Sequence, residues 1–297
     1  MEGLISKIQH LSTQDGPGIR TTIFFKGCLM NCAWCHNPEA IDRNINIGFD
    51  FKKCVNCGAC VGVCNTKALT ISNGKLIYDK SKCNRCLKCV DECFYNVITV
   101  AGKHYSEEEI IKEILQDLAY YKASNGGVTF SGGEPLLEKD FIINIIDRLD
   151  KYNISFCIET SLFVKLDKTI IDILSKCDFC FIDLKLYSSD LHKKWTKVDN
   201  ELIIKNLKEL EKYNIKIKLR TPVIEGVNDN EEELGEIAEF AKSLNNVISY
   251  TLIPYHPLGL IKYNTFDIPI RYDNKSFFDK DKLNKLQLYV DKIMGRT

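Results

Sequence analysis

Short runs of apolar and β-branched residues alternate with longer segments of helical periodicity over most of the chain. The helical segments place isoleucine, leucine or phenylalanine every three or four residues, as in "FIINIIDRL". Strands that alternate with helices in this way predict a parallel sheet. The expected strands are 20–27, 127–131, 154–160, 177–185, 215–221 and 247–255, and the expected helices between them are 138–152, 167–176, 201–213 and 230–244.

The strand at 20–27 is separated from the other five by a cysteine-rich segment. We therefore predict an α/β fold, a partial (β/α)6 barrel of the TIM type, with a second domain inserted after its first strand. Ser106 and Glu109 have the spacing of a capping box, which predicts a helix running from there to about Ala123. The predicted parts are 1–48, the start of the barrel; 49–103, the insert; and 104–297, the rest of the barrel and a C-terminal helix.

Charge and hydropathy exclude several classes of function. The 297 residues hold 40 Lys and Arg against 40 Asp and Glu, so the formal net charge is zero and a general nucleic-acid binder is not expected. The first twenty residues lack the basic start and apolar core of a signal peptide, and no stretch reaches about 18 uncharged apolar residues. We expect a cytoplasmic protein that contacts no membrane and acts as a monomer.

Cysteine is the unusual residue, with 14 in the chain, and in a reducing compartment clustered thiols usually bind metal. Residues 54–64 and 83–93 each read CxxCxxCxxxC and repeat at an offset of 29. This spacing resembles that of bacterial ferredoxins, in which three cysteines bind one [4Fe–4S] cluster and the fourth binds the other. A pair of zinc sites is the weaker alternative. The resemblance implies one cluster on Cys54, Cys57, Cys60 and Cys93, and another on Cys64, Cys83, Cys86 and Cys89.

A separate triplet, Cys28, Cys32 and Cys35, follows the first strand with Trp34 before its last cysteine. Three thiolates leave one iron of a [4Fe–4S] cluster without a protein ligand and open to a small molecule. Three incidental thiols, or a zinc site completed by His36, are the alternatives. The spacing CxxxCxxC in this position resembles the signature of radical S-adenosylmethionine enzymes.

Further segments narrow this resemblance. "SGGEP" at 131–135 follows a strand and looks like the motif of that family that receives the methionine amino group. The segment "TQDGPGIRTTIFFKGCLMNCAWCHNPE", together with "FIDLK", "KLRTPVIEGVND" and "LIPYHPLG", is similar to the activating enzymes of glycyl radical enzymes. Longer members of that group carry a ferredoxin-like insert.

The resemblance implies a role for each matching residue. The catalytic residues would be the three cysteines of the triplet with Lys185 and Asp15, the latter near the incoming glycine loop. Hard oxygen ligands would suit a monovalent cation beside the cofactor. The implied S-adenosylmethionine site is Trp34, Gly132, Gly133, Glu134, Asp183, Lys185, Arg220 and His256, and the implied cation site is Glu159, Thr160 and Asp183.

The implied reaction is the reductive cleavage of S-adenosylmethionine to methionine and a 5′-deoxyadenosyl radical, which removes hydrogen from a glycine Cα of a partner glycyl radical enzyme. The implied cofactors are three [4Fe–4S] clusters, one catalytic and two auxiliary, with flavodoxin or ferredoxin as electron donor. Three roles stay open for the auxiliary clusters: a relay of electrons, which we favour, a docking face for the partner enzyme, and stabilisation of the insert. Two alternatives remain open: a radical enzyme that transforms a small molecule, and a non-catalytic electron carrier. The carrier would leave the "GGE" motif and the three-cysteine site unexplained.

Overall fold

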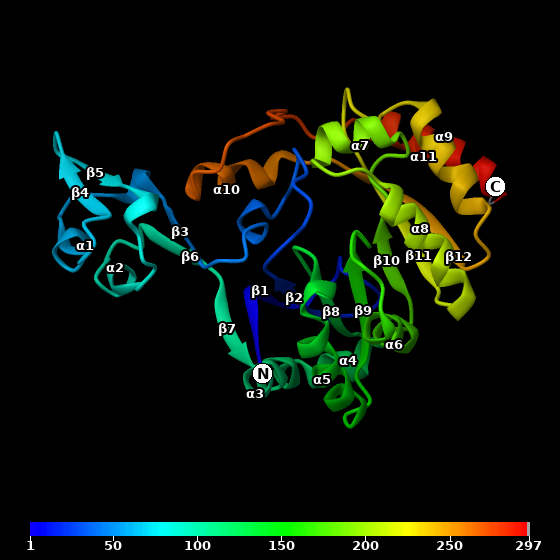
Figure 1. Cartoon of the computed structure of the whole chain (residues 1–297), viewed down its shortest axis with the longest axis horizontal. Helices are drawn as coiled ribbons and strands as arrows, with labels where there is room; N and C mark the ends of the chain where they lie inside the picture. The colour runs from blue at the N-terminus through cyan, green and yellow to red at the C-terminus, as the bar shows by residue number, and fades with distance from the viewer. Residues whose placement is uncertain (296–297) are drawn as a thin grey trace.

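The computed structural model describes residues 1–295 and is built around one mostly parallel, eight-stranded sheet of order β12-β11-β10-β9-β8-β2-β1-β7 (Figure 1). Strands β2 and β8 to β12 run parallel to one another, which matches the six strands expected from the sequence. The sheet forms an open, partial barrel. These strands are β2 (Arg20–Phe25), β8 (Gly127–Gly132), β9 (Ser155–Thr160), β10 (Cys180–Asp183), β11 (Ile217–Val223) and β12 (Val247–Pro254).

Helices cover one face of the sheet because alternate strand residues point outward to meet their apolar stripes. The capping box at Ser106 is present, and the helix it starts breaks at Asp117 into two pieces. The longer helices are α3 (Glu107–Gln116), α4 (Leu118–Ser124), α5 (Lys139–Asp150), α6 (Lys168–Lys176), α7 (Ser189–Thr196), α8 (Glu201–Leu210), α9 (Glu231–Lys242), α10 (Leu260–Thr265) and α11 (Lys280–Ile293). The short 3-10 turns are η1 (Pro38–Ala40), η4 (Pro135–Glu138), η5 (Glu211–Tyr213) and η6 (Pro257–Gly259).

Two edge strands were not expected from the sequence. Strand β1 (Glu2–Ser12) pairs antiparallel with β2, and β7 (Lys103–Ser106) pairs antiparallel with β1. The register of β1 shifts twice, between Ile5 and Lys7 and again between Gln9 and Ser12, so its side chains lose the strict period of two that identifies a strand. The all-parallel sheet that the sequence predicted is therefore a mixed sheet at one edge.

Residues 46–101, which we call the Cys-rich unit, form two small antiparallel pairs outside the main sheet (Figure 1). Strand β3 (Asn46–Phe49) pairs with β6 (Ile98–Ala101), and β4 (Leu69–Ser72) pairs with β5 (Lys75–Tyr78). A small core of its own includes Phe49, Leu69 and Val97. The remaining elements are η2 (Phe51–Lys53), α1 (Ala59–Gly62), η3 (Lys80–Lys82) and α2 (Lys88–Asp91).

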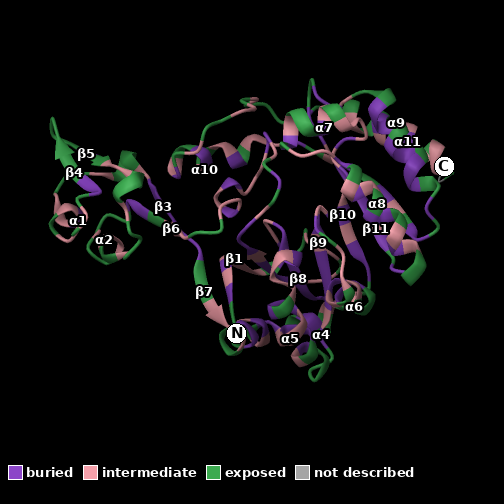
Figure 2. Ribbon diagram, viewed as in Figure 1, coloured by how far each residue is buried: buried purple, intermediate pink, exposed green. Residues whose placement is uncertain are grey.

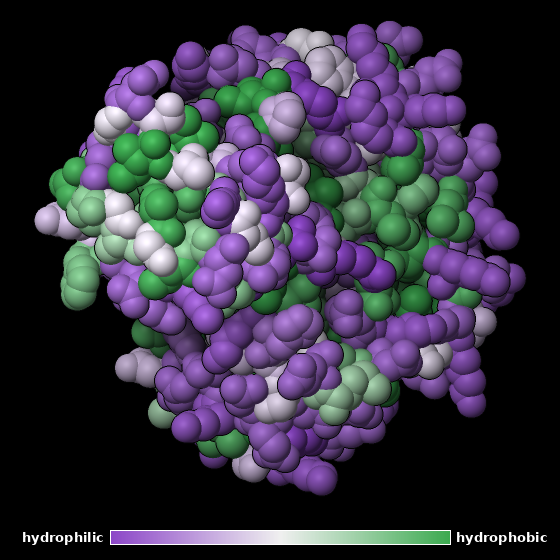
Figure 3. All heavy atoms as spheres, turned by 60° about the vertical axis from the view of Figure 1, so that its left-hand side comes forward, coloured by the Kyte–Doolittle hydropathy of each residue, from purple (hydrophilic) through white to green (hydrophobic). Residues whose placement is uncertain are grey.

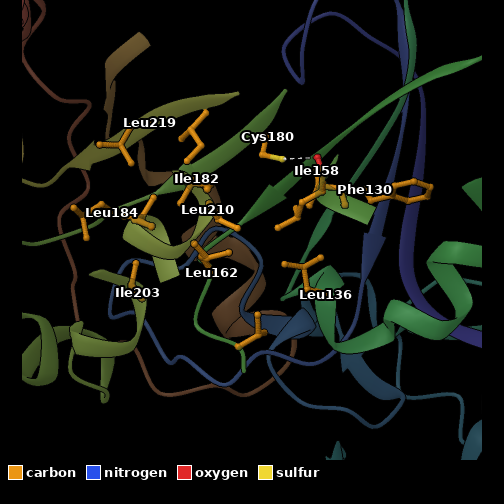
Figure 4. Packing of buried hydrophobic residues seen from close by; sticks show 14 of the residues in the cluster. Phe130, Leu136, Ile158, Leu162, Cys180, Ile182, Leu184, Ile203, Leu210 and Leu219 are labelled. Carbon is orange, nitrogen blue, oxygen red and sulfur yellow. Dashed lines mark hydrogen bonds between the residues drawn. The ribbon is translucent and has the colours of Figure 1, made fainter. Parts of the chain in front are cut away.

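The main core lies between the sheet and its helices. Buried positions run along the strands while much of the Cys-rich unit is exposed (Figure 2). Phe130 is fully buried, and its ring lies 6.1 Å from that of Phe25 and 6.0 Å from that of Phe156. Figure 4 shows how Ile158 and Ile182 extend this packing from strand to strand. The sheet that carries the strand ends is therefore held by one continuous apolar layer.

None of the helices among residues 1–295 is long and apolar enough to cross a membrane.

Replacing Phe130 with alanine should lower the free energy of unfolding by about 3–5 kcal/mol, because the cavity would lie inside the aromatic cluster. Chemical denaturation of the anaerobic protein measures this change. Leu288→Ala on α11 is the control, since that side chain is 67% exposed and its loss should cost little. Equal destabilisation by the two variants would contradict the proposed place of the core.

Candidate functional site

The cysteine triplet lies in a loop at the carboxyl end of β2, where it is held by backbone hydrogen bonds to distant segments. The N–H of Cys28 donates to the carbonyl of Ile41 at 3.0 Å, and the N–H of Ala33 donates to the carbonyl of Trp195 at 2.9 Å. The rings of Trp34 and Trp195 lie 6.3 Å apart. The loop is therefore fixed from both sides, by η1 and by the end of α7.

Burial raises the pKa of the triplet's thiols. The pKa of Cys28 and of Cys35 rises to about 12, and that of Cys32 rises as well, although the nearby Lys185 opposes the shift at Cys32. Thiolates bind metal and thiols do not, so metal binding here must displace protons from all three sulfurs. Three partly buried thiols are a donor set that fits an iron–sulfur cluster, and the nearby Lys185 favours the thiolate form of Cys32.

The "GGE" turn packs against the start of this loop. The N–H of Gly133 donates to the carbonyl of Phe25 at 2.9 Å, and the N–H of Glu134 donates to the carbonyl of Gly27 at 2.7 Å. A Cβ on Gly133 would meet the carbonyl oxygen of Gly27 at 2.3 Å, and Gly132 has a φ of +111°. Both glycines are therefore required for the close approach of β8 to β2.

Glu134 is 1% exposed, and its carboxylate is occupied by donors of the protein. It accepts from the hydroxyl of Thr160 at 2.6 Å, from the hydroxyl of Ser161 at 2.7 Å and from the N–H of Ser161 at 3.0 Å. Burial raises its pKa, and these hydrogen bonds oppose the shift. The carboxylate thus joins the ends of β8 and β9.

Four charged side chains meet near the ends of β9 and β10, beside the middle of β11. Arg220 donates from Nε to Asp183 at 2.9 Å and from Nη1 to Glu159 at 2.8 Å, and Lys185 lies 3.2 Å from Asp183. The hydroxyl of Ser131 donates to the second oxygen of Glu159 at 2.6 Å. The network is electrically neutral, and it lies on the face of the sheet opposite the helices because strand residues alternate.

Burial alone would raise the pKa of Asp183, and the cations of Arg220 and Lys185 more than offset it, so the pKa is lowered. Burial alone would likewise lower the pKa of Lys185, but Asp183 and Cys32 raise it overall. All four side chains are at most 24% exposed. Both cations thus stay charged, and Lys185 lies beside the cysteine loop.

His256 follows β12 and stacks on His36, with ring centroids 4.0 Å apart and planes inclined by 3°. His36 Nε2 lies 3.0 Å from the carbonyl of His256. The pKa of His36 falls to about 4 through burial and the neighbouring imidazole. Nδ1 of His256 is buried and has no hydrogen-bond partner among the described residues. The end of β12 therefore packs directly on the residue that follows Cys35.

The other predicted residues lie apart from this network. Asp15 accepts from the hydroxyls of Ser12 and Thr22, both at 2.6 Å. Because Thr22 lies inside β2, Asp15 is held beside the middle of that strand and not at its carboxyl end. The hydroxyl of Thr160 is directed to Glu134, whereas Glu159 and Asp183 share one guanidinium. The structure brings the two carboxylates together around a cation of the protein.

The Cys-rich unit gathers its eight cysteines around two small hollows. Among residues 1–295 no three His, Cys, Asp or Glu side chains converge as they would on a single metal ion. A [4Fe–4S] cluster takes each thiolate on a different iron. One hollow is lined by Cys54, Cys57, Cys60 and Cys93 (the first cysteine set), and the other by Cys64, Cys83, Cys86 and Cys89 (the second cysteine set).

Some positioning residues were not predicted. The hydroxyl of Tyr263 donates to the carbonyl of Cys35 at 3.0 Å, and Trp195 and Ser161 make the contacts described above. Ser131 lies inside the quoted "SGGEP" motif, so its proximity to the site could have been inferred. Tyr263 and Trp195 come from distant helices, and their sequence context carries no signal.

Comparison with known proteins agrees with this geometry. The radical SAM superfamily matches residues 22–241. The trans-4-hydroxy-L-proline dehydratase activating enzyme of Clostridioides difficile is 41% identical over 268 residues, covering 89% of this chain and 88% of that protein. The 4-hydroxyphenylacetate decarboxylase activating enzyme of Clostridioides difficile (strain 630) is 36% identical over 300 residues, covering 98% and 94%.

A solved structure shares the fold. The radical SAM methyltransferase from Sphaerobacter thermophilus aligns with a TM-score of 0.53 at 13% identity, over 97% of this chain and 74% of that one. Such low identity bears on the fold alone. The matched residues and the two relatives show the family. The chain belongs to the radical SAM superfamily and, within it, to the activating enzymes of glycyl radical enzymes.

Proposed function

We propose that this protein activates a glycyl radical enzyme by reductive cleavage of S-adenosylmethionine. The observation that carries the proposal is the position of the triplet Cys28, Cys32 and Cys35, fixed at the end of β2 beside Lys185, which shares Asp183 with a second cation, Arg220. An open iron and two neighbouring cations are complementary to the amino-carboxylate group of S-adenosylmethionine.

The three cysteines would hold a [4Fe–4S] cluster. When bound, this cluster supplies one electron to S-adenosylmethionine, which then yields methionine and a 5′-deoxyadenosyl radical that takes hydrogen from a glycine Cα of the partner. The chain's own residues orient the two substrates and exclude water. Trp34 and Tyr263 fix the cysteine loop for this purpose.

Lys185 and Arg220 are suited to the carboxylate and ribose region of S-adenosylmethionine. Both are nearly buried, so an anionic ligand gains attraction in a site of low dielectric. Because Asp183 already pairs with both, the ligand must share these cations with the protein. His256, with its unpartnered Nδ1, would meet another polar edge of the ligand.

We assign Gly132, Gly133 and Glu134 to the methionine amino group chiefly through backbone placement. The carboxylate of Glu134 is already saturated, so the turn would act by fixing the carbonyls of the "GGE" segment beside the cluster. For the Glu134 carboxylate to bind the ammonium directly, it would have to give up a hydrogen bond from Thr160 or Ser161. Asp15 would face the incoming glycine loop, from the concave side of β2.

We propose that residues 49–103 form a ferredoxin-like domain inserted between barrel segments 1–48 and 104–297. Support comes from the repeated cysteine motif and from the two hollows, each lined by the four cysteines expected from cross-ligation. Two auxiliary [4Fe–4S] clusters would bring the total to three. They would relay electrons from flavodoxin or ferredoxin to the triplet.

The partner is proposed to be a glycyl radical enzyme of the kind activated by the relatives, which are named for a hydroxyproline dehydratase and a hydroxyphenylacetate decarboxylase. The protein would act in the cytoplasm as a monomer. A monovalent cation at Glu159, Thr160 and Asp183 would have to displace Arg220 from the two carboxylates.

Anaerobic reconstitution tests the function. We expect about twelve irons per chain and, after reduction, formation of 5′-deoxyadenosine that depends on a peptide carrying a glycyl-loop sequence. Cys28→Ala should reduce iron to about eight and abolish cleavage, whereas Cys180→Ala, at a buried core thiol, should keep both. About two metal ions and no cleavage would mean structural zinc and would end the catalytic proposal.

Arg220→Ala should weaken S-adenosylmethionine binding by about tenfold or more while iron content is unchanged, because a charge-assisted contact is lost. Binding to the oxidised protein by isothermal titration calorimetry measures it. Arg220→Lys should recover only part of the affinity, since one ammonium cannot bridge Asp183 and Glu159 as the guanidinium does. An unchanged affinity in Arg220→Ala would remove Arg220 from the site.

Cross-ligation predicts which cysteines share a cluster. Cys93→Ala and Cys54→Ala should perturb the same cluster signal in electron paramagnetic resonance spectra, and the double variant should lose no more than one auxiliary cluster. Cys64→Ala should perturb the other signal, together with Cys83→Ala. If Cys93 and Cys83 perturbed one signal, each repeat would bind its own cluster instead.

A further inference from the structure

The Cys-rich unit has a net positive charge, although the net charge of the whole chain is zero. Residues 46–101 contain eight Lys and Arg against four Asp and Glu, a net charge of +4. Because the full chain is neutral, the remainder carries −4. An acidic protein would therefore be attracted to this unit and repelled by the rest of the molecule.

Within the unit the charge is not shared equally between the two cysteine sets. The internal repeat allows a position-by-position comparison at the offset of 29 residues. Next to the second set, Lys67, Arg85 and Lys88 are all exposed, and the corresponding positions next to the first set are the uncharged Asn96, Asn56 and Ala59. Lys82 makes no difference, because it corresponds to Lys53 and pairs with Asp79 at 3.0 Å, and Asp91 in place of Gly62 offsets one of the three charges. We call Lys67, Arg85 and Lys88 the basic rim.

The surroundings of the first set are less basic and more apolar. Its hollow is lined by Glu92, Val55 and Tyr95 in addition to its cysteines, and the last two are more than half exposed. Phe94 beside it is 87% exposed. Figure 3 turns the side of the molecule with this unit toward the viewer and shows hydrophobic atoms among hydrophilic ones. The two sets therefore present different surfaces, one apolar with a carboxylate and one basic.

The backbone of the basic rim contacts cysteines of the second set. The N–H of Arg85 donates to Sγ of Cys83 at 3.4 Å, and the N–H of Lys67 donates to the carbonyl of Cys64 at 3.0 Å. Lys88 begins α2 between Cys86 and Cys89, and Cys86 is itself exposed. A protein bound to this rim would thus lie next to the second cysteine set.

We propose that the basic rim is the docking site of an acidic one-electron carrier protein, and that electrons enter the molecule at the second cysteine set. The inference rests on the proposed function, since it needs a [4Fe–4S] cluster at that set. In the step, the reduced carrier loses one electron and the oxidised cluster gains it, and no bond is made or broken. The first set, with its apolar surroundings, is not the point of entry.

Charge reversal tests the proposal on the reconstituted chain, with an acidic flavodoxin as the probe. Arg85→Glu with Lys88→Glu should weaken binding of oxidised flavodoxin, and slow reduction by its hydroquinone in stopped flow, by about tenfold at low ionic strength. Arg85→Gln with Lys88→Gln should give a flavodoxin affinity and a reduction rate between those of this variant and the wild type. The effect should shrink with added salt.

The repeat supplies a matched control. Lys52→Glu with Lys53→Glu changes the net charge of the unit equally but at the entrance to the first set, and should alter both measurements by less than about twofold. Equal losses in the two charge-reversal variants, or no loss in Arg85→Glu with Lys88→Glu, would overturn the proposal. Iron content and dithionite-driven cleavage of S-adenosylmethionine test the proposed function separately, because neither uses the carrier.

Discussion

The geometry of the site depends on the contact of Glu134 with three strands. Its N–H donates to Gly27 at the end of β2, and its carboxylate accepts from Thr160 and Ser161 at the end of β9, while Glu134 itself ends β8. A buried carboxylate is stable only when its oxygens are hydrogen-bonded, so these strand ends are held at one level. The cysteine loop begins directly after Gly27, so its starting position is fixed by the same hydrogen bond.

Electrostatics adds a second constraint at the same edge. Arg220, in the middle of β11, binds two carboxylates near the ends of β9 and β10, and Lys185 connects this network to the cysteine loop. A buried ion network that is fully paired tolerates low dielectric, whereas removing one partner leaves an uncompensated charge. The network therefore holds the strands together at this edge of the sheet. Its two cations can also attract an anionic ligand.

The sequence predicted the six parallel strands and the grouping of the eight cysteines, because strand periodicity and cysteine spacing are local signals. It did not reveal β1, whose register shifts break the alternation, nor the saturation of Glu134, whose partners Thr160 and Ser161 are distant in sequence. It treated Thr160 and Glu159 as neighbours around a cation, but adjacent strand residues point to opposite faces. Local sequence patterns do not show which side chains of different strands will contact one another.

The proposed cycle needs two protein partners, one that donates an electron and one that yields a hydrogen atom. If both bound the same surface, each turnover would require the exchange of one for the other. An acidic carrier is attracted to the +4 unit and is repelled by the like charge of the −4 remainder. Under this proposal, the neutral net charge of the chain is the sum of a basic unit that binds the carrier and an acidic remainder that leaves the barrel to the glycyl radical enzyme.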